Sequence, residues 1–299
     1  MTVSIGNGLP DIVAVQKKLY PLIFTDIVSE QPTKQPIATA YGFKASEDTD
    51  DSSDWKAFKF TLDRWAAKVE STKLKTEISL ETIQDLEALG LSVDLITESL
   101  ADQVADDINT TIVESLNAIS SIGTAFDVST ITNDFDKGRE LYAKLHKESS
   151  AIEKSTGCQA SYVIAGTDSF GLLIGSGMAK RVTDTNLYVL DSGMKLVHDK
   201  YATSEYITIG VKKPMGDYEI SSLIFSPYNF DGDVDSGIAY QHLGMDPKSF
   251  HPVFGLIARF ALTVSPLGVD QTGVHEIDWD NLGDLANSSK LSYTHAVTV

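Results

Sequence analysis

Three aspartates at alternate positions form the strongest candidate for a metal site in this sequence: Asp231, Asp233 and Asp235. Two glycines in the same stretch allow the chain to turn sharply, and carboxylates spaced in this way begin many calcium-binding loops. An EF-hand loop would also place glycine at its sixth position and a bidentate glutamate at its twelfth, whereas this chain has Ser236 and His242 there. The EF-hand interpretation therefore fails. A looser calcium site at the three aspartates stays open as a hypothesis beside the plainer interpretation, a polar turn.

Motifs for covalent or phosphate-dependent catalysis fail when they are compared with the chain. In residues 166–171, GTDSFG, the serine lies one position too far from the first glycine for a nucleophile elbow. In residues 171–180, GLLIGSGMAK, the lysine does not directly follow a glycine, as a phosphate-binding loop requires. The six histidines are scattered, and none forms a pair at helical metal-ligand spacing. The sequence therefore predicts a protein that is not an enzyme and that needs no cofactor.

The net charge of −18 argues against direct binding of nucleic acid, because phosphate neutralisation needs a basic face. The single cysteine, Cys158, excludes an intramolecular disulfide and a multi-cysteine zinc site, which fits a reducing compartment. No apolar run approaches the roughly 20 residues of a membrane helix, and the first residues lack the pattern of a secretory signal. We therefore expect an ordinary globular protein with no membrane partner.

The elements that must position these residues begin with a long helix. Apolar residues recur every three to four positions from about 94 to 119, which predicts one amphipathic helix with a continuous stripe. A shorter helix is predicted at about 80–89, before Gly90, and a third at about 136–155, before Gly157. We expect all three stripes to pack in a core.

Strand patterns lie on both sides of these helices. Two alternating runs, from Ile37 and from Trp55, enclose an acidic loop and predict a β-hairpin, with a bulge or bend near Asp63 and Arg64 where the apolar parity changes. Further strands are predicted at residues 162–165, 187–190, 206–211, 222–228, 253–264 and 291–299. The fourth and fifth of these are expected to pair across a long loop. A few long helices followed by mixed strands predict the α+β class.

Several motifs along the chain together resemble those of a known protein family. Residues 244–255 read GMDPKSFHPVFG and Arg259 follows them, while residues 195–211 hold a Tyr-Ala pair, an acidic-aromatic pair and a glycine-containing strand. Upstream, residues 74–86 run into Gln-Asp-Leu, and residues 20–26 read YPLIFTD. Together these segments resemble the major capsid proteins of tailed bacteriophages, specifically those of T-even-like myophages.

The resemblance implies the tailed-phage major capsid fold (Hong Kong 97-like), which is α+β. That fold has an N-terminal arm, an extended hairpin loop, a peripheral domain with a long spine helix, and an axial domain. The expected segments, in chain order, are the arm at 1–36, the hairpin loop at 37–73, the peripheral domain with the spine helix at 74–157, the axial domain at 158–219, the peripheral strands and loop at 220–268, and a C-terminal segment returning to the axial domain at 269–299.

The implied function is that of a structural virion protein. The chain would be a major capsid protein that self-assembles into hexamers and pentamers of an icosahedral phage head. It would assemble in the host cytoplasm, meet vertex, portal and decoration proteins, and enclose double-stranded DNA without specific contacts. Three alternatives stay open: a vertex paralogue that forms pentamers only, a cellular nanocompartment shell with the same fold, and a calcium-dependent binding protein.

Charged loops are the candidate contacts between subunits. The acidic tip of the hairpin is expected to reach over a neighbour and meet lysines, with Lys137, Lys144 and Lys147 as candidates. The loop with the three aspartates is expected near a quasi-threefold axis, where Lys248, a neighbour's lysine or a cation would neutralise the charge. The full set of contact candidates is Glu47, Asp48, Asp50, Asp51, Asp54, Asp231, Asp233, Asp235, Asp246 and Lys248.

Overall fold

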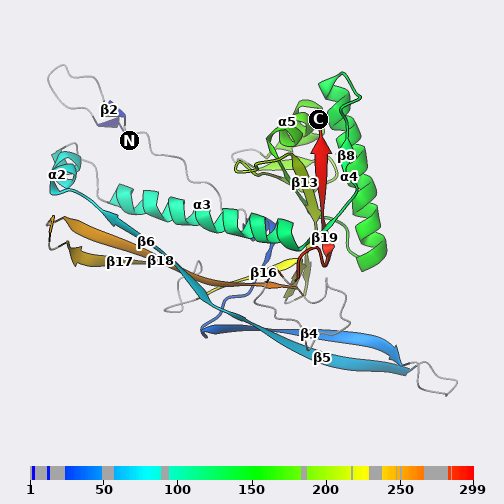
Figure 1. Ribbon diagram of the computed structural model, residues 1–299, viewed down its shortest axis with the longest axis horizontal. Coiled ribbons are helices and arrows are strands. Elements are labelled where there is room, and N and C mark those ends of the chain that lie inside the picture. Colours follow the sequence, from blue (N-terminus) through cyan, green and yellow to red (C-terminus); the bar gives the residue numbers. More distant parts are fainter. Residues whose placement is uncertain are drawn as a thin grey trace.

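The structure is a computed structural model that describes residues 2–3, 12–13, 24–48, 57–88, 94–182, 187–216, 218–228, 238–246, 248–249, 251–265, 282–283 and 285–299. Figure 1 shows an elongated molecule built around a long helix, α3. One sheet runs beneath this helix, a second sheet with its own helices stands at the end of it, and a long hairpin projects below both (Figure 1).

The long helix α3 (Asp94–Ile119) has the bounds that its apolar spacing predicted. The described part of its stripe is almost fully buried, at Val104, Ile108, Ile112, Leu116 and Ile119. These side chains share one core with residues of both sheets, among them Phe225 and Val264 of the first and Tyr162 and Ile164 of the second. Each buried side chain of this size contributes about 1.5–3 kcal/mol to stability. The helix therefore joins the two sheets through a common core.

The first sheet has five strands within the described residues. In spatial order they are β17 (Ile238–Met245), β18 (Pro252–Val264), β16 (Leu223–Pro227) and β3 (Ser29–Glu30), with β6 (Glu70–Glu77) also paired to β18. The antiparallel pairing of β16 with β18 confirms the predicted partners. Strand β17 was not predicted. It lies in the segment that was expected to be a loop and carries a register shift between His242 and Gly244, the second of which has a φ of 99°.

The second sheet has eight strands within the described residues. They are, in spatial order, β10 (Ala179–Arg181), β11 (Tyr188–Leu190), β12 (Lys195–His198), β9 (Tyr162–Ala165), β13 (Tyr206–Gly210), β19 (Ser289–Thr298) and β7 (Ser120–Ile122), with β8 (Phe126–Asp127) also paired to β19. The predicted strands at 162–165, 187–190, 206–211 and 291–299 all lie here. The last strand is inserted between β13 and β7, so the sheet is completed by residues from the end of the sequence.

Helix α4 (Asp134–Thr156) begins and ends where polar and glycine signals favour it. The side chain of Asn133 accepts from the backbone N–H of Phe135 at 3.2 Å, and Gly157 closes the helix with a φ of 72°. Its buried residues Leu141, Leu145 and Ile152 share a core with β9, β13 and β19. The expected domain boundary at residue 157 therefore separates two parts of one core, because α4 packs with the eight-stranded sheet.

Helix α5 (Thr167–Gly175) was missed by the sequence analysis, which treated this stretch only as a failed catalytic motif. Its amino-terminal end is capped by a distant side chain. Glu205 accepts from the backbone N–H groups of Asp168 and Ser169 at 3.1 Å each, and from the Ser169 hydroxyl at 2.9 Å. Because Glu205 lies 36 residues beyond Ser169 in the chain, no local sequence pattern predicts this cap.

The long hairpin consists of β4 (Ile37–Asp48) and β5 (Ala57–Lys68). The two strands pair in one continuous register, so the predicted bulge near Asp63 and Arg64 is wrong. At the base of the hairpin, Ala67 and Val69 are buried with Ala261 of β18. The change in apolar parity therefore marks the face that packs on β18 at the base, and no extra residue enters the ladder.

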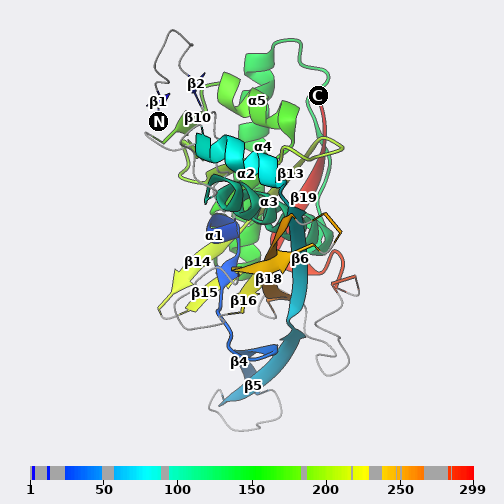
Figure 2. The same ribbon diagram turned by 90° about the vertical axis from the view of Figure 1, so that its left-hand side faces the viewer.

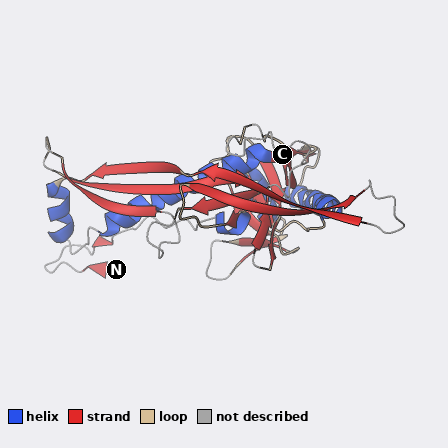
Figure 3. Cartoon of the chain, turned by 90° about the horizontal axis from the view of Figure 1, so that it is seen from below, coloured by secondary structure: helices blue, strands red, loops and turns tan. Residues whose placement is uncertain are grey.

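The remaining elements are short. They are β1 (Thr2–Val3) paired with β2 (Ile12–Val13), helices α1 (Phe24–Ile27) and α2 (Leu80–Ala88), and a hairpin of β14 (Lys212–Met215) with β15 (Tyr218–Ser221). Figure 2 shows β14 and β15 on the opposite side of the molecule from β19. Seen from below, the long strands lie side by side along the molecule with helices behind them (Figure 3). Among the described helices, none combines the length and apolarity needed to cross a membrane.

Candidate functional site

The predicted contact residues are only partly open to structural description. Asp231, Asp233 and Asp235 lie outside the described residues, as do three acidic residues of the hairpin tip, Asp50, Asp51 and Asp54. Glu47 and Asp48 are the last two residues of β4, where the backbone alone is described. The calcium hypothesis thus stays a hypothesis. In the part of the chain that is described, no group of three acidic, histidine or cysteine side chains could hold a metal ion.

Asp246 and Lys248 lie at one end of the five-stranded sheet, just after β17. The backbone N–H of Lys248 donates to the Asp246 carboxylate at 2.7 Å, and the backbone N–H of Asp246 donates to the carbonyl of His251 at 2.9 Å. The hydrogen bond from Lys248 is the main reason that the pKa of Asp246 lies below its ordinary value. The carboxylate is therefore charged at neutral pH, and its contact with Lys248 uses the backbone, which leaves the exposed ammonium group for other contacts.

The same end of the sheet is held together by Glu77, the last residue of β6. The Nδ1 atom of His251 lies 3.2 Å from its Oε1, and the hydroxyl of Ser249 donates to the same oxygen. Beside this cluster the side chain of Met245 is 63% exposed. We refer to Glu77, Met245, Asp246, Lys248 and Ser249 as the sheet tip. It combines a fixed polar framework with an exposed apolar side chain, which suits a contact surface.

The three candidate lysines lie on α4, and two of them have partners in their own chain. Lys137 lies 3.5 Å from the carboxylate of Asp134. Lys144 donates to the carbonyl of Asp127 at 2.8 Å, and its Nζ lies 5.8 Å from the centre of the Phe126 ring. Lys147 is exposed. Among the three, Lys147 is therefore the least committed to contacts within the subunit.

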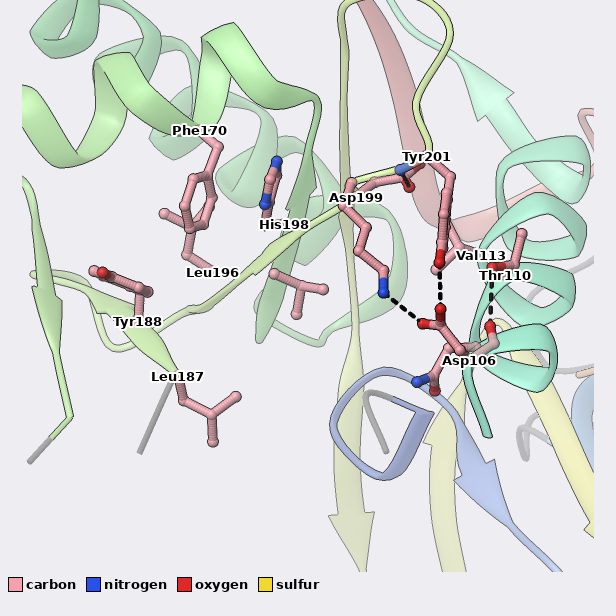
Figure 4. A pocket seen from close by; sticks show the side chains of 13 residues that line it. Asp106, Thr110, Val113, Phe170, Leu187, Tyr188, Leu196, His198, Asp199 and Tyr201 are labelled. Atoms are coloured by element: carbon pink, nitrogen blue, oxygen red, sulfur yellow. Dashed lines mark hydrogen bonds and ion pairs between the residues drawn. The ribbon is translucent and has the colours of Figure 1, made fainter. Parts of the chain in front are cut away.

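A cavity of about 270 Å³ lies where α3 meets the eight-stranded sheet (Figure 4). An aromatic group forms one wall, because the Phe170 ring stacks on His198 at 4.6 Å and meets Tyr188 edge-on at 5.4 Å. On the other side, Asp106 of α3 receives the Lys200 ammonium group at 2.7 Å and the hydroxyl of Tyr201 (Figure 4). The polar bridge and the aromatic wall therefore line opposite sides of the cavity (Figure 4).

The segment 199–206 supplies the polar contacts to Asp106; it was part of the family motif at 195–211 in the sequence analysis, which assigned it no contact. Asp199 accepts from the backbone N–H of Tyr201 at 3.0 Å and from the hydroxyl of Tyr206. Burial, and after it the hydrogen bond to Asp199, raises the pKa of Tyr206 far above its ordinary value. The phenol therefore stays protonated. The local signals were the family motif and the density of acidic and tyrosine residues. Their partners on α3 and α5 are fixed by the fold.

Comparison with known proteins gives four findings. Residues 43–297 match the family described as "Gp23: Major capsid protein Gp23". The chain is 64% identical to the capsid vertex protein of Vibrio phage KVP40 over 299 residues, which is the full length of both. It is 28% identical to the major capsid protein of the same phage over 252 residues, which covers 72% of this chain and 47% of that protein. Among solved structures, the capsid of Myoviridae phage XM1 aligns with a TM-score of 0.55 at 10% identity, covering 96% of this chain and 95% of that one.

Proposed function

The chain belongs to the Gp23 major capsid protein family, and we propose that within this family it is the vertex subunit, which forms pentamers at the corners of an icosahedral phage capsid. The observation that carries this proposal is the 64% identity to a capsid vertex protein along the whole of both chains. The match to the major capsid protein of the same phage is weaker and covers less than half of that protein. These comparisons favour the vertex paralogue, which the sequence analysis kept as an alternative, over its main prediction of a subunit that builds both hexamers and pentamers.

The broader predictions are confirmed. The family match and the relatives make the chain a capsid protein, and the structural neighbours give it the fold of tailed-phage capsid proteins. The α+β class follows from the two sheets and the long helix. The assembly into hexamers and pentamers and the partner proteins that the resemblance implied are proposals for this chain.

A ring of identical subunits needs two different faces on each copy that complement one another. The hairpin β14–β15 offers one such face, because it projects from the side of the molecule opposite to β19 (Figure 2). Its residues Lys213 and Met215 are exposed. Within the described residues, the ammonium group of Lys213 has no hydrogen-bond or ion-pair partner in its own chain. We expect this hairpin to contact the next subunit of the pentamer, and the sheet tip to contact neighbouring hexamers of the main shell.

The role that we propose is structural, without catalysis, and the proposed site of action is the virion. The net charge of −18 supports enclosure of DNA without adhesion, since like charges repel the phosphate backbone. The proposed assembly therefore rests on contacts between protein subunits, with the host cytoplasm as the place where they form.

The test is electron microscopy of the intact virion together with quantitative mass spectrometry of its proteins. We expect density that matches this chain in the pentamers at the vertices, and a different subunit in the hexamers. The number of copies of this chain per particle should then equal the number of subunit positions in all the pentamers of the shell. Density for this chain throughout the hexamers would overturn the vertex assignment and restore the main-shell prediction. Its absence from the shell would overturn both.

A further inference from the structure

A buried histidine in the last strand faces a carboxylate on helix α4. His295 is fully buried, and its Nδ1 lies 2.9 Å from the carbonyl oxygen of Thr124. Because a carbonyl oxygen only accepts, Nδ1 carries a proton whether the ring is neutral or charged. The other ring nitrogen, Nε2, has no hydrogen-bond partner among the described residues. The carboxylate of Glu148 lies close to it, with Oε2 at 4.0 Å from Nε2.

Glu148 occupies a position that its helix otherwise reserves for the core. The buried residues of α4 follow the helical repeat through Leu141, Leu145 and Ile152, and Glu148 is the step between the last two. Its side chain is 24% exposed, so it lies at the edge of the core with its carboxylate turned toward His295. A charged residue in an apolar stripe costs stability unless it finds a partner there.

The walls around His295 prevent its ring from turning toward another partner. The ring stacks on Phe126 with a centroid distance of 4.2 Å and an angle of 14°. On the side of Gly123, a Cβ atom would lie 2.0 Å from the ring, so the close approach of the backbone requires glycine at that position. The neighbour of His295 across the strand pair is Ile207, an apolar residue of the same core.

We propose that His295 and Glu148 form a proton-dependent clamp that closes the eight-stranded body. In the neutral form, the lone pair of Nε2 and the carboxylate are two acceptors that face each other. When Nε2 gains a proton, it becomes a donor to Glu148, and the charged ring lies over the face of Phe126. The clamp then ties α4, β19 and the segment 123–128 together. This inference concerns the subunit itself and does not depend on the vertex assignment.

Two further charged groups lie near this pair. Lys144 of α4 opposes the protonation of His295 through like charge, but its ammonium group is held by the carbonyl of Asp127. The carboxylate of Asp127 on β8 is engaged by the backbone N–H and the hydroxyl of Ser129. Glu148 is thus the one acid in the described part of the chain that is aimed at Nε2. Since the proton converts Nε2 into a donor to Glu148, we expect protonation to strengthen the closed state.

The experiment compares full-length wild-type protein with H295Q, E148Q and the double variant by urea unfolding at pH 5.5 and pH 8. We expect each single variant to lower the folding equilibrium constant severalfold more at pH 5.5 than at pH 8. The double variant should lose no more than the single ones at pH 5.5. H146Q is the matched control, because His146 is an exposed histidine of the same helix that contacts only the edge of Tyr142 among the described aromatic rings. It should leave the pH dependence unchanged.

A second readout keeps the clamp testable if H295Q fails to fold. The backbone N–H groups of Gly123 and Val128 donate to carbonyls of β19, at Thr294 and Thr298. Hydrogen-exchange protection of these two amides should rise from pH 8 to pH 5.5 in the wild type and stay constant in E148Q. Equal pH dependence of wild type and E148Q, in unfolding or in exchange, would overturn the clamp. So would a loss of the pH dependence in H146Q.

Discussion

Asp106 and Lys200 join the long helix to the eight-stranded body, with a distance of 2.7 Å between Oδ1 and Nζ. The side chains are 13% and 27% exposed, so solvent screens this pair less than it would screen a pair on the open surface. The hydroxyl of Tyr201 donates to the same carboxylate. One side chain of α3 therefore receives two donors from the segment 199–206.

Replacing Asp106 by asparagine should loosen this junction. D106N keeps the shape of the side chain but removes the charge that Lys200 meets, and we expect a loss of about 1–2 kcal/mol in the free energy of unfolding, measured with urea. D107N is the control, since Asp107 is exposed on the same helix. Among the described residues its carboxylate accepts a hydrogen bond from the Gln103 side chain, and its backbone carbonyl accepts one from the Thr111 hydroxyl. Equal losses in D106N and D107N would show that the junction contributes little.

Gly210 should not tolerate a side chain. It pairs with Tyr162 across β13 and β9, and a Cβ atom at Gly210 would lie 2.2 Å from the Tyr162 hydroxyl oxygen. Because Tyr162 is fully buried, it has no room to move away. We expect G210A to cost about 2–3 kcal/mol in thermal or urea unfolding. G175A, at a glycine with open space where the Cβ would lie, should cost much less.

The hydrogen bonds to Asp127 should make a contribution to folding stability that is lost in acid. Hydrogen bonds from the side chain and backbone of Ser129 are the main causes that hold the pKa of Asp127 below its ordinary value of 3.8. A lowered pKa in the folded state means that the contribution is present above pH 3.8 and is lost as the pH falls through the folded-state value. The difference in unfolding midpoint between wild type and D127N should therefore shrink below pH 3.8. In an S129A background, the difference in unfolding midpoint with and without D127N should be smaller. A wild-type-to-D127N difference that does not change with pH would contradict the assignment.

Met245 tests the sheet tip as a contact surface. M245D places a charge on a side chain that is already exposed, so the thermal unfolding of the isolated subunit should stay the same. Incorporation of the subunit into particles should fall severalfold if the tip meets neighbouring capsomers, as judged by mass spectrometry of purified virions. S150D adds the same charge at an exposed position of α4 and serves as the control. Normal incorporation of M245D would remove the tip from the proposed contacts.

The sequence predicted best the elements that carry their own signal. The stripe through Ile112 and Leu116 defined α3, and Gly157 marked the end of α4. Helix α5 escaped because its nine residues include two glycines and its cap comes from Glu205. Strand β17 escaped because a bulge at Gly244 breaks its alternation. Local patterns predict elements whose partners are near in sequence, whereas α5 and β17 depend on contacts that exist only after folding.

The candidate site was less predictable for the same reason. Charge density drew attention to the loops of aspartates, yet the described contacts of the sheet tip depend on Glu77, which joins residues 172 positions apart through Ser249. The pairing of His295 with Glu148 likewise joins the last strand to a helix in the middle of the chain. A sequence shows that such groups are present, but only the fold brings them together.

The position of β19 also sets an order of events during synthesis. Its residues, Ser289–Thr298, fill the gap between β13 and β7, and its nearest partner strand in sequence, β13, ends more than 70 residues upstream. A ribosome must therefore translate almost the entire described chain before this sheet has all of its strands. Until then, β13 and β7 present open edges. A nascent subunit therefore lacks the strand between β13 and β7 until residues 289–298 have been translated.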